Sequence, residues 1–411
     1  MESLSKNRMY PWFIAIFAAV VLMVSNGQTI SGLSVFDRAF IDEFGWSLGE
    51  IKFRDMITLL LAGLVAPLFG ILIDRLGVRR CMLAGWLLLI LGNIGYSRLG
   101  SLAELYLVHA LFSFVLVACG LNAAVILVSK WFTRKRGTAI GIALMGTSLG
   151  GIVFPQYGTA MIEALGWRGA FAWGSLFPAV MLVATWLLVK DKPDVADSAA
   201  NAAAAAPDPD AGVPFAEALR SRSFWALAII AMTTFYTVLG TQAHIFVYMT
   251  DAQFNVQVAT NAISLFFFCA LVGKFIFGLA ADYFDKRLVF YGNLLVMLVG
   301  SLILIRMDVA LIWIAVTAFG LGWGGVYTMI QLTVMNIFGT RDAGKILGTI
   351  TVLDASGGGL GIWLTGVIYD TTGSYELPFL IFAGLIVVAL AALTQVRQPA
   401  QVPAATAAAA T

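Results

Sequence analysis

Residues 70–80 read Gly-Ile-Leu-Ile-Asp-Arg-Leu-Gly-Val-Arg-Arg, and residues 278–287 read Gly-Leu-Ala-Ala-Asp-Tyr-Phe-Asp-Lys-Arg. Both stretches begin with Gly, carry an Asp one helical turn later and end in basic residues. Each follows an apolar segment long enough to cross a bilayer. The second copy begins about half a chain length after the first in a protein of 411 residues. The repeat therefore predicts two similar membrane-embedded halves.

The composition is typical of a membrane protein. Hydrophobic residues make up 60% of the chain and charged residues 12%, whereas soluble domains have about 45–50% and about 25%. Cys81, Cys119 and Cys269 stand singly in apolar runs, which fits neither a disulfide framework nor a metal site. The net charge of +2 comes from short loops and not from a basic patch, so no nucleic-acid partner is expected.

Apolar runs of about 20 residues, the length that crosses a 30 Å hydrocarbon core, predict an all-α membrane protein with two pseudo-symmetric six-helix bundles. Residues 1–190 and 223–397 form the bundles, an Ala-, Asp- and Pro-rich cytoplasmic linker lies at 191–222, and a disordered tail lies at 398–411. The twelve predicted spans lie near residues 11–34, 52–73, 81–99, 103–129, 138–162, 168–189, 223–248, 257–280, 288–306, 309–335, 344–367 and 376–396.

The basic residues predict the orientation. Most of the 25 Lys and Arg residues fall in the loops that share a side with both termini, and basic loops stay in the cytoplasm. We therefore expect a multi-pass protein of the plasma membrane, the inner membrane in a bacterium, with both termini cytoplasmic. We expect it to work as a monomer in the lipid bilayer.

A second repeated pattern precedes the fifth and eleventh spans. Residues 130–137 read Lys-Trp-Phe-Thr-Arg-Lys-Arg-Gly, and residues 336–345 read Asn-Ile-Phe-Gly-Thr-Arg-Asp-Ala-Gly-Lys. With these phrases the chain resembles the major facilitator superfamily over essentially its whole length, and residues 70–80 match the loop signature of that superfamily. The phrase at 130–137 and Tyr-Asp-Thr-Thr-Gly-Ser-Tyr at 369–375 are similar to the monocarboxylate porters and the bacterial oxalate/formate antiporters.

This resemblance implies that the loop charges form a gate. Charge pairs there would hold the halves together in the outward-open state and break when they rock apart. The alternative is that these residues only set the topology. The candidate gate residues are Asp74, Arg75, Arg79, Arg136 and Asp282.

Lys274 and Asp354 are ionisable residues that fall well inside predicted spans. A charge at the membrane centre costs about 2.5–3.5 kcal/mol on insertion scales, so such residues usually face a cavity or each other. They are our first candidates for a functional site. The alternatives are an ion pair that only fixes helix register, and a Lys274 side chain that extends to the interface.

The resemblance also implies a role for each of them. Lys274 stands four residues before Gly278, where the monocarboxylate family carries an arginine that anchors the substrate carboxylate. Lysine lacks the planar fork of arginine and acts as a point charge. Asp354 lies where oxalate-type relatives carry a lysine, which disfavours oxalate exchange. We expect Lys274 to bind one carboxylate, and Asp354 to be its counter-ion in the empty site and to take up a proton as the substrate enters.

Other side chains are weaker candidates. His244 in the seventh span has an imidazole that titrates in the working pH range, although a lone histidine on an apolar helix more often serves packing. Arg54 and Asp55 near the outer end of the second span form either an outer-gate pair or an interface anchor. Polar residues able to hydrogen-bond a substrate are Gln28, Asn122, Tyr236, Tyr327 and Gln331.

The sequence contains no phosphate loop, no nucleophile and base set and no metal cluster, so we expect neither an enzyme nor a cofactor. The function that we expect is secondary active transport of a small monocarboxylate, such as a lactate- or pyruvate-like acid, by proton symport with alternating access. The alternatives are an exporter or antiporter of another organic anion or amphipathic compound, and a non-transporting membrane sensor.

Overall fold

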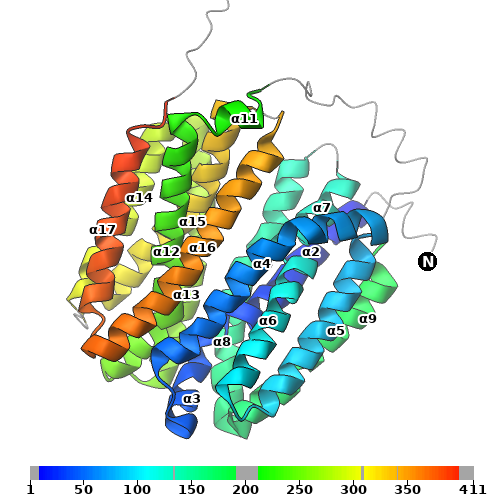
Figure 1. The fold of residues 1–411 in the computed structure, drawn as a ribbon, viewed down its shortest axis with the longest axis vertical. Coiled ribbons are helices and arrows are strands. Elements are labelled where there is room, and N and C mark those ends of the chain that lie inside the picture. Colours follow the sequence, from blue (N-terminus) through cyan, green and yellow to red (C-terminus); the bar gives the residue numbers. More distant parts are fainter. Residues whose placement is uncertain (1–8, 133–134, 191–211, 307–309, 340, 398–411) are drawn as a thin grey trace, which may run out of the picture.

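A computed structural model describes residues 9–132, 135–190, 212–306, 310–339 and 341–397. It is helical almost throughout (Figure 1). The first half contains α2 (Tyr10–Asn26), α3 (Asp37–Phe44), α4 (Leu48–Leu76), α5 (Val78–Ser97), α6 (Leu102–Ala118), α7 (Leu121–Trp131), α8 (Arg136–Gly174) and α9 (Leu176–Leu188). The second half contains α11 (Phe215–Ala218), α12 (Arg222–Asp251), α13 (Val256–Tyr283), α14 (Lys286–Ile305), α15 (Ile312–Phe338), α16 (Ala343–Thr372) and α17 (Glu376–Leu393).

Within these residues, eleven helical segments are long and apolar enough to cross a membrane. One of them, Gly137–Leu188, has 52 residues, more than twice the length that one crossing needs. It breaks at Gly166, where φ is 70° and ψ is 168°, a conformation that suits glycine. Counting that segment as two crossings gives the twelve spans predicted from the sequence.

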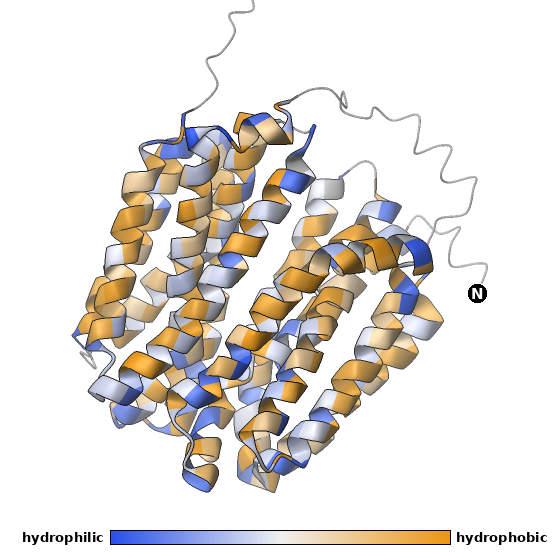
Figure 2. Ribbon diagram, in the orientation of Figure 1, coloured by the Kyte–Doolittle hydropathy of each residue, from blue (hydrophilic) through white to orange (hydrophobic). Residues whose placement is uncertain are grey.

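Large apolar side chains cover the outer surface of the bundle. Leu64 is 72% exposed and Leu107 is 66% exposed, although both are in the middle of long helices. Figure 2 shows hydrophobic residues along the helices and hydrophilic residues concentrated near their ends. Such a surface is favourable in contact with lipid and unfavourable in contact with water. The chain is an integral multi-pass membrane protein.

The backbone conformation explains the central glycine in the first copy of the repeated loop. Gly77 joins α4 to α5 with φ 88° and ψ 152°, which a residue with a Cβ adopts only with strain. Its N–H bonds to the Ile73 carbonyl and ends α4. The glycine of this motif therefore sets the hairpin between the second and third spans.

The two halves meet along two helix pairs, α4 with α16 and α8 with α13, and we call this interface the seam. In Figure 1, α4 and α16 lie side by side between the two bundles. We call the end of the bundle that carries α3 the α3 end, and the opposite end, near α11, the terminal end.

Part of the predicted linker packs on the second half. The Val213 N–H donates to the Phe338 carbonyl at 2.8 Å, and the Phe215 N–H donates to Asp342 Oδ2 at 2.9 Å. The ammonium of Lys345 and this N–H hold the pKa of the Asp342 carboxyl below its usual value. Of the predicted linker, residues 191–211 lie outside the described part of the chain, as does the predicted tail at 398–411.

Candidate functional site

Lys274 lies on α13 and faces α8 across the seam. Its half-buried Nζ donates to Thr147 Oγ1 at 3.2 Å and to Ser148 Oγ at 3.1 Å. Both partners are neutral hydroxyls. The ion pairs among the described residues do not include Lys274, so its charge is held at the seam without a counter-ion.

Close helix packing fixes the position of Lys274. A Cβ on Gly324 of α15 would lie 2.8 Å from the Lys274 backbone nitrogen and 2.0 Å from the Ala270 carbonyl oxygen. Only glycine allows α15 to approach α13 this closely. The backbone that carries Lys274 is therefore supported from behind while its side chain extends to the other half.

Asp354 lies on α16 and is 7% exposed. Its charge acts on Tyr327 of α15, whose hydroxyl interacts with Gln331 on the same helix. Among the described residues, Asp354 forms no ion pair with Lys274. Asp354 thus lies near Tyr327 and is not paired with Lys274, which is bound to the hydroxyls of α8.

The remaining polar candidates differ in their surroundings. Gln28 is buried on η1 (Gly27–Ser31), a π-helical turn after α2, where Nε2 donates to the Gly174 carbonyl and Oε1 accepts from Asn93. It lines a cavity of about 20 Å³. Tyr236 is half-buried on α12 beside α16, and Asn122 is exposed on α7. These three are not gathered with Lys274 by any hydrogen bond in the described residues.

His244 is fully buried on α12 with both ring nitrogens in contact with protein atoms. Nδ1 lies 3.2 Å from the Tyr375 hydroxyl and Nε2 lies 2.8 Å from the Ile362 carbonyl oxygen. A neutral imidazole with one donor and one acceptor nitrogen satisfies both contacts. In this arrangement His244 ties α12 to α16 and to the start of α17, and it would reach a substrate only if these contacts opened.

A buried network of four charges lies near the α3 end. Asp37 of α3 forms ion pairs with Lys52 and with Arg54, whose Nη2 is 2.6 Å from Asp37 Oδ1. Arg54 also pairs with Asp55 at 3.6 Å. Two cations and two carboxylates balance, which offsets part of the cost of burying each charge.

This network reaches the second half of the molecule. Lys52 Nζ donates to the Ala243 carbonyl oxygen of α12 at 2.5 Å as well as to Asp37. Arg54 Nη1 and Asp55 Oδ1 are buried without a hydrogen-bond partner. Lys52 is therefore a direct link between the halves, in a network that is not fully satisfied.

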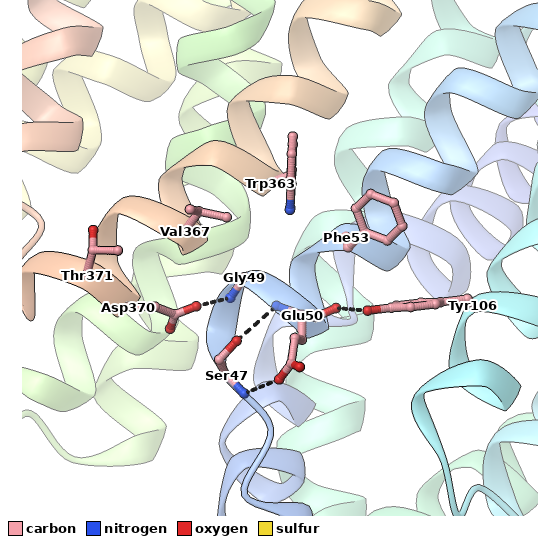
Figure 3. A pocket seen from close by; sticks show the side chains of 9 residues that line it. All are labelled: Ser47, Gly49, Glu50, Phe53, Tyr106, Trp363, Val367, Asp370 and Thr371. Atoms are coloured by element: carbon pink, nitrogen blue, oxygen red, sulfur yellow. Dashed lines mark hydrogen bonds between the residues drawn. The ribbon is translucent and has the colours of Figure 1, made fainter.

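Three further contacts cross between the halves at the α3 end. Arg38 forms an ion pair with Asp251 at 3.3 Å, and within the second half the Tyr369 hydroxyl donates to the other oxygen of Asp251 at 2.5 Å. Asp370 of α16 accepts from the Leu48 and Gly49 N–H groups at 2.9 and 2.6 Å. Figure 3 shows the Asp370 carboxylate at the first turn of α4, where the helix dipole favours a negative charge.

The candidate gate residues of the terminal end are placed as follows. Arg75 and Asp282 are exposed, and Arg79 donates to the Trp186 carbonyl oxygen in the same half. The side chains of Asp74 and Arg136 lie outside the described part of the chain. All hydrogen bonds between the halves in the described residues fall between the α3 end and Lys274.

Four residues that link the halves or the buried network are not predicted from the sequence: Asp37, Lys52, Asp251 and Asp370. A signal was present for one of them, because Asp370 belongs to the phrase 369–375 that carried the family resemblance. Asp37, Lys52 and Asp251 lie near predicted span ends, where charged residues are ordinary. Only the folded arrangement distinguishes them from topology-setting charges.

Twelve crossings in two halves, with ionisable side chains at the seam between them, are typical of a secondary membrane transporter. The chain belongs to the Major Facilitator Superfamily, whose family model matches residues 12–362 and 249–410. It is a transporter of that superfamily and not an enzyme.

Several curated relatives span most of the chain. It is 24% identical to the uncharacterized MFS-type transporter YhjX of Escherichia coli K12, over 82% of this chain and 83% of that protein. It is 22% identical to human monocarboxylate transporter 2, over 92% and 83%, and 26% identical to bovine monocarboxylate transporter 13, over 90% and 85%.

Solved structures support the fold. A bacterial homologue of the human lysosomal transporter Spinster, in an inward-facing and occupied conformation, matches with a TM-score of 0.70 at 15% identity. The match covers 95% of this chain and 97% of that one. At this identity the similarity concerns the fold alone.

Proposed function

We propose that this transporter carries a small monocarboxylate, such as a lactate- or pyruvate-like acid, together with a proton. The observation that carries the proposal is Lys274, a cation within the membrane whose only described partners are the hydroxyls of Thr147 and Ser148. A buried cation is costly without a counter-ion. A substrate carboxylate is the partner that this position lacks.

The two hydroxyls suit a site that must fill and empty. They hold the Nζ in place in the absence of substrate, and they exchange for a carboxylate oxygen more readily than a protein carboxylate would, because a neutral partner binds a cation less tightly than a charged one. Lys274 also contacts the opposite half, so an anion bound there changes the contact between α13 and α8.

Asp354 is our candidate for the proton. It is almost fully buried on α16 near Tyr327, and the ion pairs of the described residues do not include it. A carboxyl without a cationic partner in the membrane is favoured in its neutral form. Proton uptake at Asp354 would let one acid cross as an electrically neutral pair of anion and proton.

The gating charges fit the orientation that the basic loops predict. With both termini in the cytoplasm of a plasma or bacterial inner membrane, the α3 end faces outward. Contacts of Lys52, Asp251 and Asp370 between the halves would then close the outer side, while Asp74, Arg75, Arg79, Arg136 and Asp282 would act on the inner side. Similarity to monocarboxylate transporters supports the proposed substrate class.

Ligand-induced stabilisation tests the substrate class. The purified full chain is heated in detergent with lactate, pyruvate, acetate, oxalate or a neutral sugar. A ligand at 100 times its Kd stabilises the folded state by about 2.7 kcal/mol, which is visible as a higher Tm. We expect at least one monocarboxylate to raise the Tm while the sugar does not. A rise with a large amphipathic compound and with none of the acids would favour export instead.

A further inference from the structure

The two carboxylates of the buried network near the α3 end are held very differently. Asp37 Oδ1 accepts from Arg54 at 2.6 Å, Oδ2 accepts from Lys52, and the residue is fully buried. Asp55 is only 5% exposed, yet its Oδ1 is buried without a hydrogen-bond partner. Its Oδ2 lies 3.6 Å from Arg54 Nε, which is too far for a hydrogen bond. In the described part of the chain, Asp55 is thus a buried carboxylate that no hydrogen bond holds.

Arg54 keeps its position without help from Asp55. Its Nη2 donates to Asp37 and to the Leu33 carbonyl oxygen at 3.3 Å, and its guanidinium lies 5.5 Å from the centre of the Phe40 ring. None of these contacts needs a charge on Asp55. A buried carboxylate without hydrogen bonds is costly, and binding a proton removes that cost. Asp55 can therefore change its charge while the geometry around Arg54 stays the same.

The charges that surround Asp55 belong to the same network. Its carboxylate interacts with the cations of Arg54 and Lys52 on its own helix and with the carboxylate of Asp37 on α3. Its charge also acts on the Tyr96 hydroxyl of α5. A change of charge at Asp55 is consequently felt by the whole cluster.

His109 of α6 is the histidine of this cluster, and both of its ring nitrogens are occupied. Nδ1 lies 2.7 Å from Thr58 Oγ1, and Nε2 contacts the Tyr96 hydroxyl. A neutral imidazole satisfies both contacts. A proton on His109 would add a further cation beside Arg54, whose charge already acts on this ring. Such a proton is disfavoured because like charges repel.

The second half contributes ionisable groups that are already bonded. His244 and Tyr375 contact each other, and Asp370 accepts from two N–H groups of α4. Asp251 forms an ion pair and accepts a hydrogen bond. Among the described ionisable groups of this region, Asp55 is the one that can accept a proton without losing a hydrogen bond.

We propose that Asp55 binds a proton at Oδ1 and that its protonation opens the α3 end. With Asp55 ionised, two cations and two carboxylates balance, and Lys52 spans the seam to the Ala243 carbonyl oxygen. With Asp55 neutral, Lys52 and Arg54 face the single carboxylate of Asp37. An uncompensated buried cation is strongly unfavourable. Lys52 is the cation at the seam, and it reaches water when the halves separate there.

This inference goes beyond the proposed function, because it concerns access to the α3 end and holds for any substrate. In the orientation that we propose, external acid would open the outer side. Asp55 would thus control the gate, whereas Asp354 would carry the proton that crosses with the substrate.

Distances between two spin labels test the proposal, measured by pulsed electron paramagnetic resonance on the full chain in lipid nanodiscs without substrate. The labels are attached through Ala103→Cys and Leu377→Cys, after Cys81, Cys119 and Cys269 are replaced by alanine. Both positions are exposed, at the starts of α6 and α17, which begin at the α3 end (Figure 1). We expect the ratio of long to short distances to rise from about pH 8 to about pH 5, by at most about tenfold per pH unit, the limit for one proton. A distance that does not depend on pH would overturn the proposal.

Three variants assign the proton to its residue. Asp55→Asn mimics the neutral carboxyl and should give the long distance at both pH values. Asp42→Asn removes an exposed carboxylate of α3 outside the network, and Asp354→Asn removes the proposed transport proton, so both should keep the pH response. A pH response that persists in Asp55→Asn, or a short distance in it at both pH values, would overturn the proposal. Loss of the response in Asp354→Asn alone would overturn it as well and would place the switch at Asp354.

Discussion

Among single residues, the energetics of Lys274 support the binding role that we propose for it. A charged side chain inside the membrane costs about 2.5–3.5 kcal/mol on insertion scales. Hydrogen bonds to Thr147 and Ser148 return only part of that cost. A substrate anion would offset the remaining cost, because its carboxylate would pair with the Lys274 ammonium. The same reasoning does not apply to His244, whose two nitrogens are already bonded.

Replacing Lys274 tests this directly. Lys274→Ala should lower kcat/KM for the monocarboxylate about 30-fold or more, since truncating a buried charged partner costs about 2 kcal/mol or more and each 1.4 kcal/mol is tenfold. Uptake of radiolabelled substrate into proteoliposomes measures the effect. The matched control is Lys345→Ala, which removes a mostly exposed lysine of α16 and should transport normally. Equal rates in the two variants would remove Lys274 from the site.

Asp354 allows a separate prediction. Asp354→Asn keeps the shape of the side chain but cannot gain or lose a proton. Exchange of labelled for unlabelled substrate should continue, whereas net uptake driven by a pH gradient should fall to the background of empty liposomes. Comparing the two modes in one preparation separates coupling from folding. Undiminished pH-driven uptake would show that the proton is carried elsewhere.

Among the elements, α3 and the first turns of α4 form one connected unit, which we propose as the gate of the α3 end. Asp37 enters the buried network through Lys52 and Arg54, and the same stretch of α4 is capped by Asp370 from α16. The positions of α3, the start of α4 and the end of α16 thus depend on one another. Removing a charge from this unit leaves another charge buried and unpaired, which is more costly than the pair was favourable.

Two aspartates of α3 form a matched pair for testing this unit. Asp37 is fully buried, whereas Asp42 forms an exposed ion pair with Arg38. Asp37→Asn should destabilise the protein by about 3–5 kcal/mol, and Asp42→Asn by less than about 1 kcal/mol. Thermal unfolding in detergent measures both. Similar Tm values for the two variants would mean that the network is not a structural element.

The sequence predicts the elements of this fold well and their contacts poorly. Membrane thickness imposes a length on each span, so apolar runs locate the spans, and the duplicated loop with Gly77 reveals the two halves. The boundaries shift where polar residues are buried, as at the start of α4, which begins at Leu48 and not near residue 52. Lys274 and Asp354 are predictable because a charge inside an apolar run is rare. The partnership of Asp37 with Lys52 is not predictable, because it depends on how α3 folds back on α4.

At the scale of the whole molecule, the seam is joined at the α3 end by bonds that can break together. Glycines let the halves approach closely there, since a Cβ on Gly366 of α16 would lie 3.0 Å from the Gly49 Cα of α4. Two packed surfaces of this kind favour discrete positions over gradual deformation. In the transport cycle that we propose, one half would move against the other about the candidate site at Lys274.

A bulky residue in the seam should hold the α3 end open. Gly366→Leu overpacks the contact at a cost of about 1–3 kcal/mol, which shifts the two-state population about fivefold or more. Thr260→Cys reports the change, because Thr260 is buried against Thr159 across the seam. In a background with Cys81, Cys119 and Cys269 replaced by alanine, labelling of Cys at 260 by a maleimide should accelerate by that factor.

The control for this experiment is Gly384→Leu on α17, where an added Cβ meets no atom within 4 Å. It should leave both labelling and transport unchanged. If Gly366→Leu also left the labelling rate unchanged, the α4 and α16 contact would not control access from the α3 end.

We propose that an acid crosses this protein as an anion and a proton together. Internal acidification of proteoliposomes that contain a pH-sensitive dye measures it most directly, after addition of lactate, pyruvate, acetate, oxalate or a neutral sugar in turn. We predict acidification well above that of empty liposomes with at least one monocarboxylate, no response to the sugar, and no response when Lys274→Ala is reconstituted. Silence with all the monocarboxylates, or an equal response from Lys274→Ala, would contradict the claim.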